Sequence, residues 1–321
     1  MKVSIMIPNY NGKGLLEENL PYAFAALRQA GCEGELVVAD DASTDDSCRF
    51  IREHHPDCIL IEASENLGFA GNCNRGIRVC RGEWVLVLNS DVKLAPDYLK
   101  ILLAFARGES VFGLSGSIYP DNGGPISDGG KFPAWNGIML NTTLNYEVLE
   151  PEGNAFPALF LSGAAALIHA EKFRELGGFQ ELFNPYYFED AEIGLMAWRN
   201  GWASLYVPDA RCFHRISSTI GKNTGKEKVR IIARRNKFLM HAIHLGGWRR
   251  LIWQISLLIP AMMGLLLPDS RMGKSYREYL LRRTAAWKRR NFIEQIPGIK
   301  PLEQVVKEIR QDLSGKIKRI F

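Results

Sequence analysis

Residues 84–91 read Trp-Val-Leu-Val-Leu-Asn-Ser-Asp, an apolar run that stops at three polar residues. A short run of this kind, followed at once by turn residues, predicts a buried strand. Helical patterns and further β-rich runs precede it, with strands over 3–7, 36–39 and 59–62 and helices over 15–30, 45–55 and 70–80. This alternation predicts an α/β fold in which helices cover both faces of a parallel sheet.

Polar side chains stand where the predicted strands end. In open sheets of this kind, ligands bind in the crevice beyond the carboxyl ends of the strands. Asp40 and Asp41 follow the second strand, and their carboxylates could accept hydrogen bonds from a ribose or a base. Helix capping is the alternative. Capping accounts for Asp45 and Asp46 but leaves the first pair unexplained, which favours a ligand there.

The fourth predicted strand runs into Asn89-Ser90-Asp91. A carboxylate fixed at Asp91 could hold Mg²⁺ or Mn²⁺, and such a cation would bridge the phosphates of a nucleotide. The same three residue types are also ordinary turn residues. Taken alone, the tripeptide therefore predicts only a turn.

An aromatic triplet, residues 186–188, leads into Glu189 and Asp190 at the start of a helix predicted over 190–200. The helix dipole favours acidic residues in a first turn, so acidity there needs no function. The dipole does not explain the three aromatic residues. Rings beside a carboxylate form a partly desolvated wall, which favours a general base and can stack on a sugar.

The remainder of the chain changes character near Arg211. Before it, residues 120–158 are rich in Gly, Pro and Asn and predict a long irregular segment near the site. A strand is predicted over 203–207, and beyond Arg211 the pattern is entirely helical. His214 follows that strand. A lone histidine is more often packed or exposed than a ligand, so by itself it predicts no metal site.

Charge changes sign along the chain, although the whole carries a net charge of only +5. Residues 1–210 hold 15 Lys and Arg against 28 Asp and Glu, whereas residues 211–321 hold 25 against 7. A basic block suits phosphate groups, nucleic acid or an anionic membrane face. No nucleic-acid motif accompanies it, so we expect no nucleic acid as partner. Six cysteines without a CxxC pair or zinc-ligand spacing predict reduced packing residues in a cytosolic protein.

Within the basic block, residues 251–267 carry no charge. As a helix they would span about 25 Å against roughly 30 Å of hydrocarbon, which makes a poor transmembrane span. One interpretation is a helix lying in the membrane interface, with Trp248 and Trp253 at headgroup level and Lys and Arg near anionic lipids. The other is a helix packed on the rest of the protein or on a partner subunit.

Taken in order, these segments resemble the family 2 glycosyltransferases with the GT-A fold, over roughly residues 1–240. The motifs that carry the resemblance are Ile7-Pro8-Asn9-Tyr10-Asn11, Asp40-Asp41-Ala42-Ser43-Thr44-Asp45, Glu65-Asn66-Leu67-Gly68-Phe69-Ala70-Gly71-Asn72, Leu88-Asn89-Ser90-Asp91, Ser162-Gly163-Ala164, Gly177-Gly178-Phe179, Glu189-Asp190 and Val207-Pro208 leading to His214. The chain is most similar to members that add rhamnose or related sugars to bacterial surface glycans. The resemblance implies a three-layer α/β/α sandwich with a mostly parallel sheet, followed by a helical C-terminal extension.

The resemblance also implies roles for individual residues. Those that would bind the nucleotide and donor are Pro8, Tyr10, Asp40, Asp41, Asn72, Asn89, Ser90 and Asp91. Asp91 and His214 would bind a divalent cation, Mn²⁺ or Mg²⁺. Asp190 would be the catalytic base, with Gly163 and Glu189 on the acceptor side. Asn89 stands where many members have Asp, and an uncharged amide lowers the expected affinity for the metal.

The activity that the resemblance implies is transfer of a sugar, with inversion, from a UDP-, dTDP- or GDP-linked donor to a hydroxyl of a glycan or lipid-linked acceptor in bacterial cell-surface polysaccharide synthesis. We expect residues 1–240 to form the catalytic domain, with a nucleotide-binding half over 1–110 and an acceptor half over 111–240. Residues 241–321 would form a helical basic region at the inner membrane surface. The enzyme would then be cytoplasmic and peripheral on the inner face of the cytoplasmic membrane.

Two other classes of protein stay open. A sugar-phosphate nucleotidyltransferase would share the fold, the nucleotide and the metal, but no Gly-rich loop containing Arg or Lys follows the first strand. A non-catalytic nucleotide-sugar binding protein is favoured by Asn89 and disfavoured by intact Asp91, Asp190 and His214. Turnover separates these classes, because only the transferase releases a nucleoside diphosphate and a glycosylated acceptor.

Overall fold

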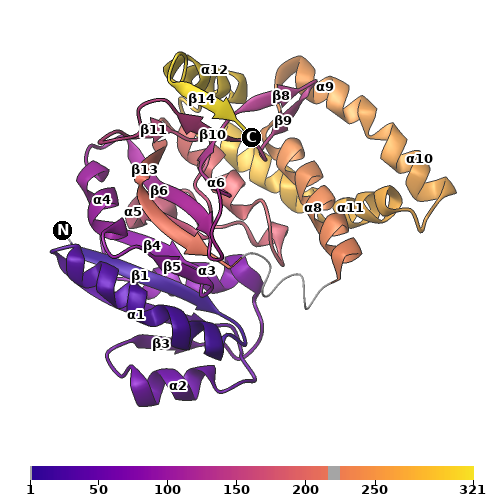
Figure 1. Cartoon of the computed structure of the whole chain (residues 1–321). Helices are drawn as coiled ribbons and strands as arrows, with labels where there is room; N and C mark the ends of the chain where they lie inside the picture. The colour runs from indigo at the N-terminus through magenta and orange to yellow at the C-terminus, as the bar shows by residue number, and fades with distance from the viewer. Residues whose placement is uncertain (1, 216–224) are drawn as a thin grey trace.

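The structure, a computed structural model, describes residues 2–215 and 225–321 (Figure 1). The main strands are β1 (Lys2–Asn9), β2 (Glu33–Asp40), β3 (Ile59–Glu62), β4 (Trp84–Leu88), β5 (Val92–Leu94), β6 (Val111–Pro120), β11 (Phe156–Pro157), β12 (Ala165–His169) and β13 (Ala203–His214). Within the described residues they form a nine-stranded sheet in the order β11-β13-β6-β12-β4-β1-β2-β3, with β5 paired to β13. β1 runs parallel to β2 and to β4, and β2 runs parallel to β3, as the sequence predicts.

Direction reverses in the middle of this sheet. β12 runs antiparallel to both of its neighbours, β4 and β6, while β6 and β13 are parallel to each other. β5 and β11 also run antiparallel to β13. The sheet is therefore mixed, although its longest ladders, β1 with β2 and β6 with β13, are parallel.

Alternate side chains of the central strands face two separate cores, as the twofold period of a strand requires. Val3, Ile5 and Leu86 face one core, which α1, α2 and α4 cover. Val85 and Val87 face the other, which α3, α5 and α6 cover. The helices are α1 (Lys13–Gln29), α2 (Ser47–His54), α3 (Gly68–Val79), α4 (Tyr98–Phe105), α5 (Ala170–Glu175) and α6 (Glu189–Arg199). The predicted three-layer α/β/α sandwich is confirmed (Figure 1).

The segment 120–158 is less irregular than the sequence predicts. It holds the short strands β7 (Gly130–Lys131), β8 (Ala134–Asn136), β9 (Met139–Asn141) and β10 (Asn145–Val148), followed by β11. β8 pairs with β9, and β7 pairs with β10. Strands of two to four residues have too few positions to show a period. Whether such segments form strands therefore depends on the strands with which they pair.

The prediction that the chain is entirely helical beyond Arg211 is wrong at two places. β13 continues to His214, seven residues past the predicted end of the strand at 207. Pro208 lies in a register shift of this strand, and a proline in a sequence argues against the interior of a sheet. At the other end, β14 (Ile317–Ile320) pairs with β10. That pairing joins residues far apart in the chain, which no local pattern reveals.

The helices that follow residue 225 are α8 (Lys226–His244), α9 (Gly247–Ser256), α10 (Leu258–Leu266), α11 (Arg271–Glu294) and α12 (Leu302–Asp312). Among them, α8, α11 and α12 pack on the core of α6. Leu239, Ile293 and Ile309, one from each of α8, α11 and α12, are buried in one apolar cluster with Leu195 of α6. α8 crosses residue 240, where the sequence analysis divides the chain, and that division stays a prediction.

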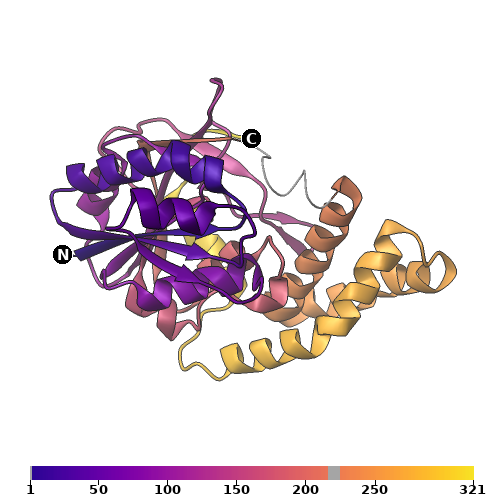
Figure 2. The same ribbon diagram turned by 90° about the horizontal axis from the view of Figure 1, so that it is seen from below.

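α9 and α10 differ from the other helices in their exposure. The stretch Gly247–Leu266 has a mean hydropathy of 1.2 over its most apolar window, of which 11% is buried. In the described part of the chain it is the one helix long and apolar enough to cross a membrane, judged by length and composition. Trp253 and Pro260 are its buried residues. Figures 1 and 2 both show α10 projecting away from the sheet, so it does not pack on the α/β core.

We predict that Ile309→Ala lowers the free energy of unfolding by about 2–5 kcal/mol, because it leaves a cavity in the core that α12 shares with α6. Denaturant unfolding followed by tryptophan fluorescence measures the change. Leu265→Ala is the matched control: Leu265 is 83% exposed, so its truncation should shift stability by no more than about 0.5 kcal/mol. Equal effects of the two substitutions would contradict the packing of α12.

Candidate active site

The loops after β1 and β2 are joined by hydrogen bonds around Asp40. The register of the strands sets Pro8 opposite Ala39 and Asn9 opposite Asp40. The Asp40 carboxylate accepts hydrogen bonds from the Asn9 amide at 2.8 Å, from the Ser43 N–H at 2.8 Å and from the Ser43 hydroxyl at 2.6 Å. The protein itself therefore engages both oxygens of Asp40, which holds the two loops together.

Asp41 holds the start of α3. Its Oδ1 accepts the N–H of Leu67 at 2.8 Å, and its Oδ2 accepts the N–H of Gly68 at 3.0 Å. Burial raises the pKa of Asp41, although these two hydrogen bonds oppose the rise. A group that accepts hydrogen bonds from the first N–H groups of a helix is a cap. Asp41 therefore caps α3, a role that the sequence analysis predicted for Asp45 and Asp46 but not for Asp41. No local signal exists, because Asp41 lies 26 residues before its partner. Asn72 is engaged as well, since its amide donates to the Ala39 carbonyl at 2.7 Å.

The loop after β1 also passes close to the loop after β4. A Cβ added at Gly12 would lie 2.4 Å from Oδ1 of Asn9 and 3.6 Å from Oγ of Ser90. The amide of Asn19 donates to the carbonyl of Ser90 at 2.9 Å. Tyr10 stands at the same end of β1 with 41% of its side chain exposed. The structure thus leaves an exposed aromatic ring beside the ends of the central strands.

Strand pairing brings Asp91 and His214 together. Val92, the first residue of β5, pairs with His214, the last residue of β13. Oδ1 of Asp91 lies 3.2 Å from Nε2 of His214. Burial of the imidazole opposes its protonation, but the hydrogen bond to Asp91 and the charge of that carboxylate outweigh burial and raise the pKa of His214.

This pair fits a divalent cation as part of a ligand set. Mg²⁺ is usually held by one or two protein side chains, with substrate phosphates and waters at about 2.1 Å, so that neighbouring ligands lie about 3 Å apart. The 3.2 Å between Oδ1 of Asp91 and Nε2 of His214 is close to that spacing, and a cation would have to replace the proton that these two atoms share. Among residues 2–215 and 225–321, no group of three or more His, Cys, Asp and Glu side chains is arranged to hold a metal. Phosphate oxygens would therefore have to complete the set.

The loop of residues 162–164 joins the end of β4 to α6. The N–H of Asn89 donates to the carbonyl of Ala164 at 2.9 Å. The N–H of Gly163 donates to Oδ2 of Asp190 at 3.3 Å. Two successive residues of one loop thus contact the turn that carries Asp91 and the carboxylate that begins α6. A Cβ at residue 163 would lie 3.6 Å from Oδ2, an ordinary van der Waals contact, so Gly163 lies directly beside this carboxylate.

Glu189 and Asp190 are neighbouring carboxyls whose pKa values are both raised by burial. Burial and the charge of Asp190 raise the pKa of Glu189 to about 8. Burial also raises the pKa of Asp190, but Lys131 and the N–H groups of Ala191 and Gly163 lower it. Adjacent carboxyls whose surroundings push their pKa values apart take different protonation states. Near neutral pH, Glu189 therefore holds its proton, beside an Asp190 whose pKa is also raised, although Lys131 opposes that rise.

Two residues that the sequence analysis missed act on this site. Lys131 forms an ion pair with Asp128. The charge of Lys131 lowers the pKa of Asp190, and Asp128 raises both that pKa and the pKa of His214. Both lie in the segment 120–158, which the sequence places near the site without naming residues. A single Lys and a single Asp in a loop form no motif that could have identified them.

α8 holds the aromatic segment that leads into α6. The buried amide of Asn236 donates to the carbonyls of Tyr186 at 2.9 Å and Tyr187 at 2.8 Å. Buried Arg235 donates to the carbonyl of Phe183 at 3.1 Å. The rings of Tyr186 and Tyr187 pack edge to face with centroids 4.9 Å apart, and Tyr187 is 40% exposed. Residues beyond 225 thus fix the backbone just before Glu189.

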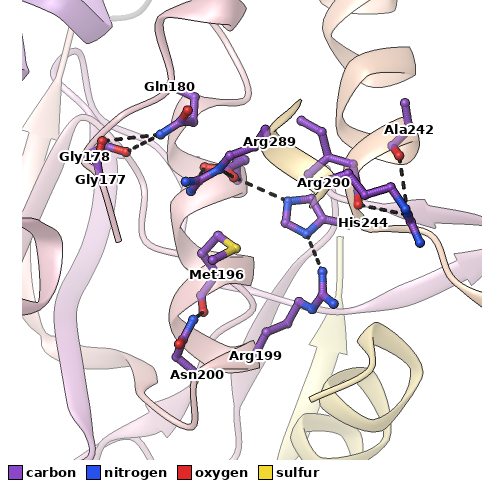
Figure 3. Close-up of polar contacts among 12 residues, drawn as sticks. Gly177, Gly178, Gln180, Met196, Arg199, Asn200, Ala242, His244, Arg289 and Arg290 are labelled. Atoms are coloured by element: carbon purple, nitrogen blue, oxygen red, sulfur yellow. Dashed lines mark hydrogen bonds and ion pairs between the residues drawn. The ribbon is translucent and has the colours of Figure 1, made fainter. Parts of the chain in front are cut away.

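A buried ion pair fixes α6 itself. Glu192, which is 0% exposed, accepts hydrogen bonds from Nε of Arg289 at 2.9 Å and from Nη2 at 3.4 Å. Burial alone would raise the pKa of Glu192, but the charge of Arg289 and the contact with His244 lower it. Burial lowers the pKa of His244 to about 4, so this imidazole is neutral near pH 7. Figure 3 shows Arg289 of α11, His244 of α8 and Arg199 of α6 gathered in this cluster.

Solved structures with this fold are glycosyltransferases. GalNAc-T7 with UDP, GalNAc and Mn²⁺ superposes with a TM-score of 0.66 and 16% identity, over 98% of this chain and 57% of that one. The mannosyltransferase PcManGT of Pyrobaculum calidifontis, in complex with GDP-Man and Mn²⁺, superposes with a TM-score of 0.56 and 20% identity, over 96% of this chain and 84% of that one. The fold is of the GT-A class, as the resemblance implied.

Sequence comparison agrees with the fold. The family model described as Glycosyl transferase family 2 matches residues 4–177. An N-acetylglucosaminyl-diphospho-decaprenol L-rhamnosyltransferase of Mycobacterium tuberculosis is 29% identical over 244 residues, which cover 67% of this chain and 76% of that protein. An undecaprenyl-phosphate 4-deoxy-4-formamido-L-arabinose transferase of Pseudomonas fluorescens is 35% identical over 110 residues, 33% of this chain and 32% of that protein. The chain therefore belongs to glycosyl transferase family 2 and is a glycosyltransferase.

We predict that Arg289→Met destabilises the protein by about 3–5 kcal/mol at pH 7, because it leaves Glu192 charged and buried without its partner. The lowered pKa of Glu192 gives stability above the ordinary value of 4.5, and this stability is lost as the pH falls through the lowered value. In the variant, only the contact with His244 still opposes burial, so Glu192 takes up a proton at higher pH than in wild type. The difference from wild type should therefore shrink between pH 7 and pH 5, as measured by denaturant unfolding.

The matched control is Lys288→Met, which removes an exposed charge from the adjacent position of α11. It should change stability by no more than about 0.5 kcal/mol at either pH. A deficit of Arg289→Met that stays constant between the two pH values would rule out the charge of Glu192 as its cause.

Proposed function

We propose that this glycosyltransferase moves a sugar from a nucleotide-sugar donor to an acceptor hydroxyl with inversion at the anomeric carbon, and that Asp190 is the catalytic base. The observation that carries the proposal is the 162–164 loop, which bonds to Asn89 beside Asp91 and to Asp190. Asp190 and the turn that carries Asp91 are then tied to the same loop. A single in-line displacement needs both groups held around the same reacting carbon.

In this mechanism, Asp190 takes the proton of the acceptor hydroxyl as the oxygen attacks the anomeric carbon, and the nucleoside diphosphate leaves. The N–H groups of Gly163 and Ala191, at 3.3 and 2.8 Å, orient the carboxylate. Burial raises the pKa of Asp190, which makes it a stronger base than a free aspartate. Glu189 stays protonated and lines the acceptor side with Gly163, so no second charge competes for the proton.

Asp91 and His214 are the residues proposed to hold a divalent cation, Mn²⁺ or Mg²⁺, together with the donor phosphates. When bound, the cation neutralises the charge that develops on the leaving diphosphate. Asn89 contributes no charge, and its buried Oδ1 has no hydrogen-bond partner in the described residues. Because residue 89 is an amide and only Asp91 supplies a carboxylate, the cation is held more by the nucleotide than by the protein.

The nucleotide is proposed to lie against the ends of β1 and β2. Tyr10 has an exposed ring that can stack on the base, beside Pro8. The carboxylates of Asp40 and Asp41 are engaged by protein N–H and O–H groups, so their contribution is mainly to hold the loops that form the pocket. Asn72 of α3 donates to the carbonyl of Ala39, just before Asp40, and Ser90 is assigned to the donor side. The donor is a UDP-, dTDP- or GDP-linked sugar.

The acceptor is proposed to be a glycan or a lipid-linked sugar in bacterial cell-surface polysaccharide synthesis. The names of the two relatives support this, since one acts on a diphospho-decaprenol and the other on an undecaprenyl phosphate. Such acceptors are anchored in a bilayer. The enzyme would therefore work in the cytoplasm, at the inner face of the cytoplasmic membrane.

Asp190→Asn should reduce turnover by about 10²–10⁴-fold, because an amide cannot take the acceptor proton. Donor binding should stay close to wild type, since Asp190 is assigned to the acceptor side. Release of nucleoside diphosphate with a membrane extract as acceptor measures turnover, and calorimetric titration with the donor measures binding.

Asp57→Asn serves as the control, because Asp57 is an exposed carboxylate in the turn between α2 and β3. It should behave as wild type in both assays. Wild-type turnover in Asp190→Asn would remove the base assignment. A wild-type protein that binds the donor and releases no diphosphate with any acceptor would instead be a non-catalytic binding protein.

A further inference from the structure

Exposed apolar side chains are concentrated on α9 and α10. Of the 21 large apolar side chains that are exposed in the described residues, ten lie in 248–267. They are Trp248, Leu251, Ile252, Ile255, Leu258, Ile259, Met262, Leu265, Leu266 and Leu267. Monomeric soluble proteins rarely leave such a contiguous apolar surface in water. This apolar ridge, residues 248–267, is therefore a contact surface.

The packing of α10 decides how the apolar ridge can meet a bilayer. α10 lies directly on α11, because a Cβ added at Gly273 would come within 3.0 Å of the Gly264 Cα. α11 begins with Arg271, Lys274 and Arg277. If α10 crossed the membrane, it would carry these charges into the hydrocarbon, which is strongly unfavourable. An orientation parallel to the membrane surface avoids this, with the apolar ridge in the acyl boundary and α11 at the headgroups.

Charge identifies the partner as an anionic bilayer. Residues 245–294, which contain the apolar ridge and α11, hold ten Lys and Arg against three Asp and Glu, and eight of the ten remain when buried Arg289 and Arg290 are set aside. Lys and Arg near a membrane surface are attracted to anionic lipids. A second copy of the chain, docked through the same face, would instead bring two basic segments together. The combination of an apolar ridge with basic flanks fits acyl chains below anionic headgroups.

We propose that the apolar ridge is a monotopic docking surface, on which α9 and α10 lie in the interface of an anionic membrane without crossing it. The inference deepens the proposed membrane location and rests on it. Figures 1 and 2 both place α10 on the side of the molecule toward which β1 and β2 run. Docking through the ridge thus keeps the active-site edge of the sheet on the membrane side, where a lipid-linked acceptor is held.

The test is flotation of the purified full chain with vesicles of phosphatidylcholine alone or of phosphatidylcholine with phosphatidylglycerol. The wild type should float with the anionic vesicles, and less with the neutral ones. Leu258→Glu/Leu265→Glu should reduce the partition coefficient by at least about tenfold, because two apolar side chains no longer enter the acyl boundary. Both residues are exposed, at 63% and 83%, so the fold should be retained.

Leu149→Glu is the matched control, since Leu149 is a 58% exposed leucine outside the ridge and should float as wild type does. Wild-type protein that stays unbound with anionic vesicles would overturn the proposal, as would a double variant that floats normally. A wild-type dimer in sedimentation that Leu258→Glu/Leu265→Glu separates would assign the ridge to a second copy. Flotation needs no turnover, so a protein that floats but transfers no sugar would refute the proposed chemistry and leave the docking surface standing.

Discussion

The two hydrogen bonds of the 162–164 loop are the contacts on which the active site depends, and the direction of β12 makes them possible. β12 starts immediately after this loop and runs antiparallel to β4, with Ala165 opposite Leu88. A parallel strand would begin at the opposite edge of the sheet and place its preceding loop far from the end of β4. The reversal brings Ala164 to Asn89 at 2.9 Å and Gly163 to Asp190 at 3.3 Å. Asp190 of α6 and the turn that carries Asp91 are thus both held by the 162–164 loop.

The basic residues of the C-terminal region form ion pairs inside the protein as well as lying at its surface. The basic C-terminal residues partly pair with acidic residues of the first two-thirds, as Arg289 does with Glu192 and Arg319 with Glu147. The Arg289 pair is buried and holds α6, which carries Asp190 in its first turn. On the other side of α11, the apolar ridge and its basic flanks face outward. The same helical region therefore fixes α6 and presents the surface that we propose for the membrane.

How far the sequence predicts this structure depends on whether the signal is local. The first four strands and their helices were predicted because each carries its own apolar run between turn residues. β5, β10 and β14 were missed because they exist through pairing with distant strands. In the site, the motifs led to Asp91 and His214, which the structure brings within 3.2 Å. They did not indicate that Asp41 caps α3, or that Lys131 and Asp128 act on Asp190, since these contacts cross between segments without a shared motif.

We propose that the end of β4 is a metal-assisted nucleotide-sugar site, and thermal unfolding with and without ligands tests this claim. Purified wild type and Asp91→Ala are heated with a panel of nucleoside diphosphates and nucleotide sugars, with and without Mn²⁺ or Mg²⁺. A ligand at 100 times its Kd stabilises the folded state by about 2.7 kcal/mol. We predict that one nucleotide series stabilises the wild type only with the metal and that Asp91→Ala loses this effect. Stabilisation that is equal in the two proteins, or absent across the whole panel for the wild type, would contradict the claim.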